Sequence, residues 1–223
     1  MKNNTIFRDG YCIRDQHATH FLTFTVCGWI DLFTRKSYRD ILLESFQYCR
    51  KHKGLILNAY VVMSNHLHLI ARANEENHLS DIIRDFKAHT HRQMIRMIQS
   101  EEESRRHWML HQLKYYASRH SRNEQYQIWI QHSHPEELLT HEMALIKLDY
   151  IHENLVRAGY VAKPQDYLYS SASNYIRGEG LIDIDFLFWY RYRETPIKNI
   201  ELTKAQPSKR ESLYSKSPQR PEA

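Results

Sequence analysis

Two histidines separated by one residue, His66 and His68, have the spacing that most clearly suggests chemistry. They follow an apolar run rich in β-branched residues and the turn-forming pair Ser64-Asn65, a pattern that predicts two strands joined by a tight turn. Side chains alternate across a strand, so both imidazoles should lie on one exposed sheet face while Leu67 points into the core. Two neutral imidazoles on one face can bind a divalent metal ion. The alternative is a half-buried strand with polar residues on its wet face.

A second pair, Tyr150 and Asn154, lies four positions apart in a stretch expected to be helical. Positions four apart share one helix face, about 6 Å apart along the axis. If this helix packs against the histidine strand, the amide oxygen of Asn154 could be a third metal ligand. Tyr150 would then stand one turn from the metal, and a tyrosine beside a metal-bound phosphate can attack phosphorus. In most proteins, however, this spacing is one core tyrosine and one surface amide.

The elements that must position these residues follow from the hydrophobic pattern. Alternating or continuous apolar runs predict strands at 20–27, 55–62, 66–72 and 126–131. Apolar residues at helical spacing predict helices at 37–51, from Ser80 onward, and from a start signal at 133–137 to Arg157, stopped by Gly159. This order predicts an α+β fold, a ferredoxin-like antiparallel sheet with helices on one face and a C-terminal helix that carries Tyr150.

The domain organisation is expected to be simple. With 223 residues, the chain can form one domain over residues 1–195. Residues 99–125 are rich in charges and aromatics and are expected to be a partly helical insertion. Proline, serine, lysine and arginine dominate the end of the chain, so residues 196–223 are expected to be a disordered tail.

Composition narrows the function classes. No apolar run approaches the length of a membrane span and the N-terminus lacks a signal peptide, so a cytoplasmic protein without membrane contact is expected. The three cysteines, Cys12, Cys27 and Cys49, lack metal-type spacing, and reduced thiols are expected. A net charge of +5 and 15 tyrosines favour a polyanionic partner whose bases can stack on aromatic rings.

Several motifs together resemble the REP-associated tyrosine transposases, a family of single-tyrosine histidine-hydrophobic-histidine transposases of the insertion-sequence-200 type. The resemblance rests on His66-Leu67-His68 and on the segment 150–159, which looks like the family's Tyr-Ile-x-x-Asn-Pro-Val-x-Ala-Gly pattern. It covers roughly residues 18–188, and further motifs fall in the family's order: Thr23-Phe24-Thr25, Phe86-Lys87, Trp129 with His134, and Tyr169-Ser170-Ser171-Ala172.

The resemblance implies a metal-dependent transposase that nicks and rejoins single-stranded DNA at hairpin-flanked sites through a 5′-phosphotyrosine intermediate. It implies that Tyr150 is the nucleophile and that His66, His68 and Asn154 hold Mg²⁺ or Mn²⁺. The expected partner is single-stranded DNA with a hairpin, bound by a monomer or a homodimer.

Residue type alone suggests that Lys87 and Arg92 bind the DNA backbone and that Trp129 stacks on bases. Leu155 departs from the family pattern, which has proline there, and a changed helix end is expected. Two alternatives remain open at this point. One is a domesticated, non-catalytic DNA-hairpin-binding protein, for which Leu155 is a warning sign. The other is an unrelated metal-dependent hydrolase that uses the two histidines with a water nucleophile.

Overall fold

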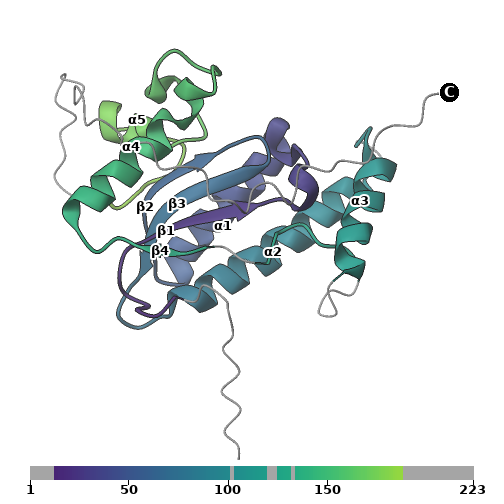
Figure 1. Cartoon of the computed structure of the whole chain (residues 1–223), viewed down its shortest axis with the longest axis horizontal. Helices are drawn as coiled ribbons and strands as arrows, with labels where there is room; N and C mark the ends of the chain where they lie inside the picture. The colour runs from purple at the N-terminus through teal and green to yellow at the C-terminus, as the bar shows by residue number, and fades with distance from the viewer. Residues whose placement is uncertain (1–12, 101–102, 120–124, 132–133, 188–223) are drawn as a thin grey trace, which may run out of the picture. The chain divides into compact units, whose positions relative to one another are not determined.

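A four-stranded antiparallel sheet organises the computed structural model, which describes residues 13–100, 103–119, 125–131 and 134–187. Its strands have the order β2-β3-β1-β4, which is the order of a ferredoxin-like sheet (Figure 1). The strands are β1 (His20–Thr25), β2 (Leu55–Val62), β3 (His66–Ala73) and β4 (Glu136–Glu137). The predicted hairpin at 55–72 is therefore confirmed.

Helices α1 (Lys36–His52) and α2 (Leu79–Gln99) pack on one face of the sheet. Leu22, Leu67 and other alternate strand residues join the apolar side chains of both helices in one core. Inside it, the rings of Phe46 from α1 and Phe86 from α2 stack with their centroids 4.6 Å apart. This arrangement leaves the second sheet face, which carries His66 and His68, free to receive another element.

That element is helix α4 (His141–Arg157), which packs on β2 and β3 (Figure 1). Thr140 caps its start by accepting a hydrogen bond from the backbone nitrogen of Met143. At its end, Gly159 adopts a left-handed φ of 75°, and Tyr160 donates to the carbonyl of Leu155 over 3.0 Å. This is a Schellman cap, so the predicted stop at Gly159 is confirmed.

The expected insertion was predicted to be partly helical, and it contains helix α3 (Arg106–Ser118). Two short 3-10 helices follow β1: η1 (Cys27–Trp29) and η2 (Leu32–Thr34). After α4 come a third, η3 (Pro164–Asp166), and the short helix α5 (Ala172–Arg177). Cys27 and Cys49 are free and buried, as expected for reduced thiols. Cys12 and the expected tail at 196–223 lie outside the described residues.

Two predicted boundaries between residues 126 and 137 were wrong. Residues 126–131 form only an isolated bridge, between Trp129 and Val26, rather than a full strand. The fourth strand is β4, which pairs with His20 and Phe21 of β1 where the sequence suggested a helix start. The proline and carboxylates of 133–137 are typical of a helix N-terminus, but here the two glutamates pair with β1 and the helix begins only at His141.

The outer edge of β2 is covered by residues that follow α4. Backbone hydrogen bonds join Val62 to Tyr169 and Ser171 to Tyr60, each over 2.9 Å. Further along, a bulge at Asn58 receives Asp185, which donates to the carbonyl of Leu57 over 2.8 Å. Unpaired edges invite pairing with another chain, and this edge is largely occupied.

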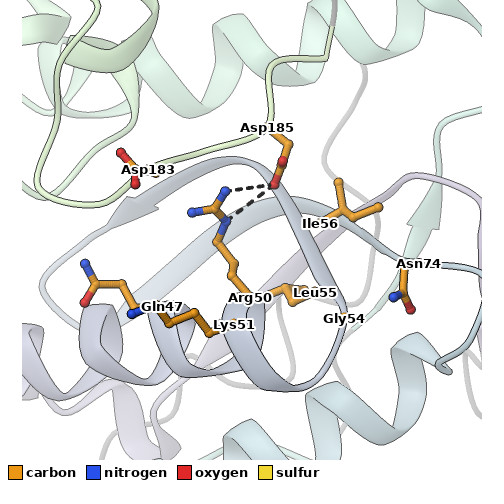
Figure 2. Close-up of a pocket in the computed structure, with 9 residues that line it drawn as sticks. All are labelled: Gln47, Arg50, Lys51, Gly54, Leu55, Ile56, Asn74, Asp183 and Asp185. Carbon is orange, nitrogen blue, oxygen red and sulfur yellow. Dashed lines mark hydrogen bonds and ion pairs between the residues drawn. The ribbon is translucent and has the colours of Figure 1, made fainter.

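A pocket of about 480 Å³ opens beside this covered edge, where α1 ends (Figure 2). Arg50 reaches across it to the carboxylate of Asp185, with an ion-pair distance of 3.2 Å. Asp183 lines the same pocket. The ion pair thus ties the segment after α5 to the first helix.

Candidate functional site

His66 and His68 lie next to each other on the sheet face under α4, with ring centroids 4.8 Å apart. The Nδ1 of His68 shares a hydrogen bond of 2.8 Å with the hydroxyl of Thr23, its partner across β1. The Nδ1 of His66 shares one of 2.7 Å with the side-chain oxygen of Asn65. Neighbours of this kind fix the orientation of metal-binding imidazoles and leave Nε2 for the ligand.

The two histidines share one face as predicted, but the expectation that this face is exposed was wrong. His68 is only 5% exposed, because Phe21 stacks on it and α4 covers the sheet. Burial, the neighbouring His66 and the charge of Lys147 lower the pKa of His68 to about 3. Burial also lowers the pKa of His66. Both imidazoles are therefore neutral at physiological pH, which is the form that binds metals.

Tyr150 reaches the same place from α4. Its ring meets His68 edge-on, with centroids 5.3 Å apart, and meets Phe21 at 5.9 Å. Its side chain is 39% exposed, so an incoming strand can reach it. The guanidinium of Arg157 lies 5.2 Å from the ring centroid and also donates to the carbonyl of Tyr150. A tyrosine, a cation and two neutral imidazoles are thus brought together within one chain.

Asn154 lies one turn further along α4 than Tyr150, as its spacing predicts. Its amide nitrogen is buried without a hydrogen-bond partner, and so is the Nε2 of His68. Buried polar atoms normally have partners, so the unsatisfied Nε2 of His68 is consistent with a ligand, whereas the amide nitrogen of Asn154 is a hydrogen-bond donor and does not itself bind a metal. In the described part of the chain, no three histidine, cysteine, aspartate or glutamate side chains form a metal cluster. A metal site here would therefore combine two imidazoles with an amide oxygen.

The expected DNA-binding residues Lys87, Arg92 and Trp129 all line one groove of about 560 Å³ between α2 and residues 125–129. Arg92 and Arg96 are exposed there and give the groove its basic character, whereas burial and the neighbouring Arg92 lower the pKa of His91, which also lines it. Trp129 does not fit the base-stacking role, because it is 6% exposed and its indole nitrogen donates to Thr90 over 3.0 Å. Its ring instead packs in the core near Phe24 and Phe33.

Two residues at the site escaped the sequence interpretation. Arg157 is close to Tyr150 because both lie on α4, seven positions apart, which is a helical spacing that the sequence does contain. Trp29 stands edge-on to His66 with centroids 6.3 Å apart, and it is 64% exposed. No local pattern indicates this second contact, because it depends on how the turn after β1 folds back over the hairpin.

No helix in the described part of the chain is long and apolar enough to cross a membrane. Comparison with curated proteins finds no match. Among solved structures, a REP-associated tyrosine transposase bound to a REP hairpin is similar, with a TM-score of 0.52 and 18% identity over 81% of this chain and 89% of that one. A candidate transposase from Deinococcus radiodurans gives a TM-score of 0.37 and 16% identity over 58% of this chain and 85% of that one.

The first of these likenesses confirms the α+β fold, at an identity that speaks for the fold alone. The family assignment rests on sequence. The model of the IS200-like transposase family matches residues 16–132, which are more than half of the chain and include His66 and His68. The match ends before α4, so it does not cover Tyr150 or Asn154. The chain belongs to the IS200-like transposase family.

Proposed function

We propose that this transposase nicks and rejoins single-stranded DNA at hairpin-flanked sites, with Tyr150 as the nucleophile. The observation that carries the proposal is the meeting of Tyr150 with the histidine pair in one chain, 5.3 Å from His68 between ring centroids. Family membership supplies the reaction class, and the position of Tyr150 supplies the attacking atom. Its exposure leaves room for a phosphodiester to approach.

In the proposed step, the phenolic oxygen of Tyr150 forms a bond to phosphorus while the bond from phosphorus to the 3′ oxygen breaks. The phenol proton passes to solvent, and the departing 3′ oxygen takes up a proton. The products are a 5′-phosphotyrosine and a free 3′-hydroxyl, and attack by a 3′-hydroxyl reverses the step. Arg157, beside the tyrosine ring, would stabilise the negative charge that develops on the phosphate oxygens.

His66, His68 and Asn154 would hold Mg²⁺ or Mn²⁺, and the buried, unpartnered Nε2 of His68 supports this assignment. When bound, such an ion polarises the phosphate and favours the phenolate form of a nearby tyrosine. Mg²⁺ prefers oxygen ligands, so two imidazoles favour Mn²⁺. Thr23 and Asn65 hold the two rings in the orientation that leaves their Nε2 atoms for the ion.

We further propose that a DNA hairpin binds along α2, in the groove that Lys87 and Arg92 line. Support comes from the basic character of this groove and from the similar transposase, which was solved with a REP hairpin bound. Phosphate contacts of this kind supply affinity and position the duplex without reading its sequence.

The test is incubation of the protein with a labelled single-stranded DNA hairpin from the flanks of its gene, with Mn²⁺, followed by a denaturing gel and peptide mapping. The expected result is a metal-dependent covalent adduct that maps to Tyr150 and is absent from Tyr150→Phe. Tyr160→Phe is the matched control, because Tyr160 follows the same helix and is 66% exposed. Removal of the ion with a chelator should abolish the adduct without releasing the hairpin.

Two results would contradict the proposal. Tight hairpin binding with neither cleavage nor adduct would identify a non-catalytic hairpin-binding protein, and the affinity would then be indifferent to Tyr150→Phe. Cleavage without a covalent adduct would identify a hydrolase that uses a water nucleophile.

A further inference from the structure

A series of aromatic side chains that the proposed chemistry does not use lies on the turn beside His66 and on the helix that packs against this turn. It begins at Trp29, whose ring stands 6.3 Å from that of His66. It continues onto the insertion helix α3 with Tyr116 and Tyr115, whose ring centroids are 5.5 Å apart. It ends at Arg119, whose guanidinium lies 4.5 Å over the ring of Tyr115. We call these four residues the aromatic lane.

Trp29 is held in an unusual position. It has a left-handed φ of 55°, directly after Gly28 with φ of 66°. Bulky residues rarely adopt this conformation, because it crowds the side chain against the backbone. The ring is nevertheless 64% exposed, so burial of apolar surface does not offset the strain. Strain of this kind at an exposed aromatic residue suggests a functional role.

The turn that carries Trp29 is fixed from two sides. From the hairpin, the amide of Asn65 donates to the carbonyl of Trp29 over 3.3 Å while its oxygen bonds His66. From the insertion, Tyr116 lies so close to Gly28 that an added Cβ would meet its ring at 2.6 Å. The insertion helix therefore braces the turn, and a single amide couples Trp29 to a proposed metal ligand.

We propose that the aromatic lane binds unpaired nucleotides of single-stranded DNA and guides the strand that flanks the cleavage site. This inference rests on the proposed function, because it takes the histidine site as the place of cleavage. Bases stack on exposed aromatic rings regardless of sequence, and nearby cations bind the intervening phosphates. The lane offers exposed rings at Trp29 and Tyr115, a half-buried ring at Tyr116, and a cation at Arg119. The ligand that fits the aromatic lane is thus a flexible single strand of DNA, whose bases stack on the rings and whose phosphates bind the cation.

The test compares two probes without metal, so that binding is separate from cleavage. One is a blunt DNA hairpin from the flanks of the gene, and the other is the same hairpin with a single-stranded extension of about eight thymidines on either strand. The wild type should bind one extended hairpin more tightly than the blunt one. Trp29→Ala should weaken that complex by about 5- to 150-fold, the loss expected for one stacked base, and leave the blunt complex unchanged.

Matched variants separate the lane from general exposure. Trp108→Ala removes another exposed tryptophan, which lies at the start of α3 and outside the lane. This variant should change the affinity for neither the blunt nor the extended hairpin. Trp29→Tyr should retain most of the affinity, because it keeps an aromatic face. Tyr115→Ala with Arg119→Ala should weaken only the extended complex, and these residues do not contact His66 in the structure. The extension should also quench tryptophan fluorescence in the wild type and much less in Trp29→Phe.

Equal affinities of the wild type, Trp29→Ala and the Tyr115/Arg119 double variant for the extended hairpin would overturn the proposal. A change in oligomeric state on Trp29→Ala, with DNA affinity unchanged, would instead make the lane a contact between copies of this chain and would also overturn it. Neither result would affect the adduct at Tyr150. Conversely, absence of that adduct with a lane that still binds the extension would contradict the proposed chemistry alone.

Discussion

The hydroxyl of Thr23 shows how one side chain on a neighbouring strand can prepare a ligand. It lies opposite His68 in the sheet register and bonds the Nδ1 of that ring. Replacement by valine keeps the shape but removes this bond, so the ring is free to rotate or to change tautomer. We predict that Thr23→Val weakens Mn²⁺ binding by about 10- to 100-fold, measured by calorimetric titration.

The matched control for this change is Thr25→Val, two residues along the same strand and on the same face. In the described part of the chain, the hydroxyl of Thr25 makes no comparable hydrogen bond to His66. The ring of His66 is instead bonded to Asn65. Equal loss of Mn²⁺ affinity in the two variants would show that His68 does not depend on Thr23 for its orientation.

Lys87 leads to a prediction about how a partly buried cation in the groove affects the stability of the fold. Burial lowers the pKa of Lys87 to about 8, while its ammonium lies over the ring of Phe24 and near the carbonyl of Ile130. The folded state therefore binds fewer protons than the unfolded state between about pH 8 and 10.5, and its stability should rise with pH across this window.

We predict that Lys87→Met removes this rise and stabilises the fold at pH 7 by about 1–3 kcal/mol, because a half-buried charge is replaced by an apolar chain of similar length. Hairpin affinity should fall at the same time, with a smaller dependence on salt. Urea unfolding at pH 7 and pH 10 measures the first effect. Unchanged stability at both pH values would mean that the ammonium is fully hydrated in the folded state.

At the scale of elements, helix α4 joins the candidate nucleophile to the sheet. Leu155 is 3% exposed inside its last turns, although the resemblance sets proline at this position. Proline would remove a backbone donor and crowd the preceding turn, at a cost of about 3 kcal/mol. We predict that Leu155→Pro lowers the melting temperature by roughly 6–12 °C, measured by circular dichroism.

The comparison variant for the helix end is Val156→Ala, which lies next to Leu155 and leaves the backbone donors intact. It should shift the melting temperature much less. An unchanged melting temperature in Leu155→Pro would show that the end of α4 accepts either leucine or proline. The departure of Leu155 from the family pattern would then give no reason to expect a changed helix end or lost catalysis.

The elements that local patterns specify were predicted well, and those that depend on distant partners were not. The hairpin of β2 and β3 was predicted because strand-forming runs flank a turn signal. Strand β4 was missed because its two residues are held by β1, more than a hundred positions earlier in the chain. The histidine pair and Tyr150 came from spacing within single elements, whereas the contact between them depends on tertiary packing.

The tryptophans illustrate the same limit. Trp129 was expected to stack on bases and lies in the core, whereas Trp29, which was not singled out, is exposed beside His66. Composition shows that aromatic rings are available, but only the packing of the turn after β1 and of residues 125–131 decides which ring faces solvent.

At the scale of the whole molecule, one outer edge of the sheet is covered and the other is the two-residue strand β4. Residues after α4 cover β2, and on the other side residues 128–130 and strand β4 lie beside β1. We predict that the chain is a monomer by light scattering, because little edge is left for pairing between sheets. Truncation after Gly180 removes Asp185 from the bulge at Asn58 and should shift the protein toward dimers at micromolar concentration.

Truncation after residue 195 is the control, because it removes only the expected tail and leaves Asp185 in place. It should leave the mass per particle at one chain. Dimers of the untruncated protein would show that another surface than the β2 edge joins two copies.

The contact of Tyr150 with His68 inside a single chain also has a genetic meaning. If the nucleophile and the metal ligands of one active site come from the same polypeptide, two defective alleles cannot repair each other. Co-expression of His68→Ala with Tyr150→Phe should therefore leave a cell without the covalent DNA adduct, and restored adduct formation would mean that chains exchange their nucleophile helices. Under the first outcome, the activity of each gene copy would depend only on the mutations in that copy.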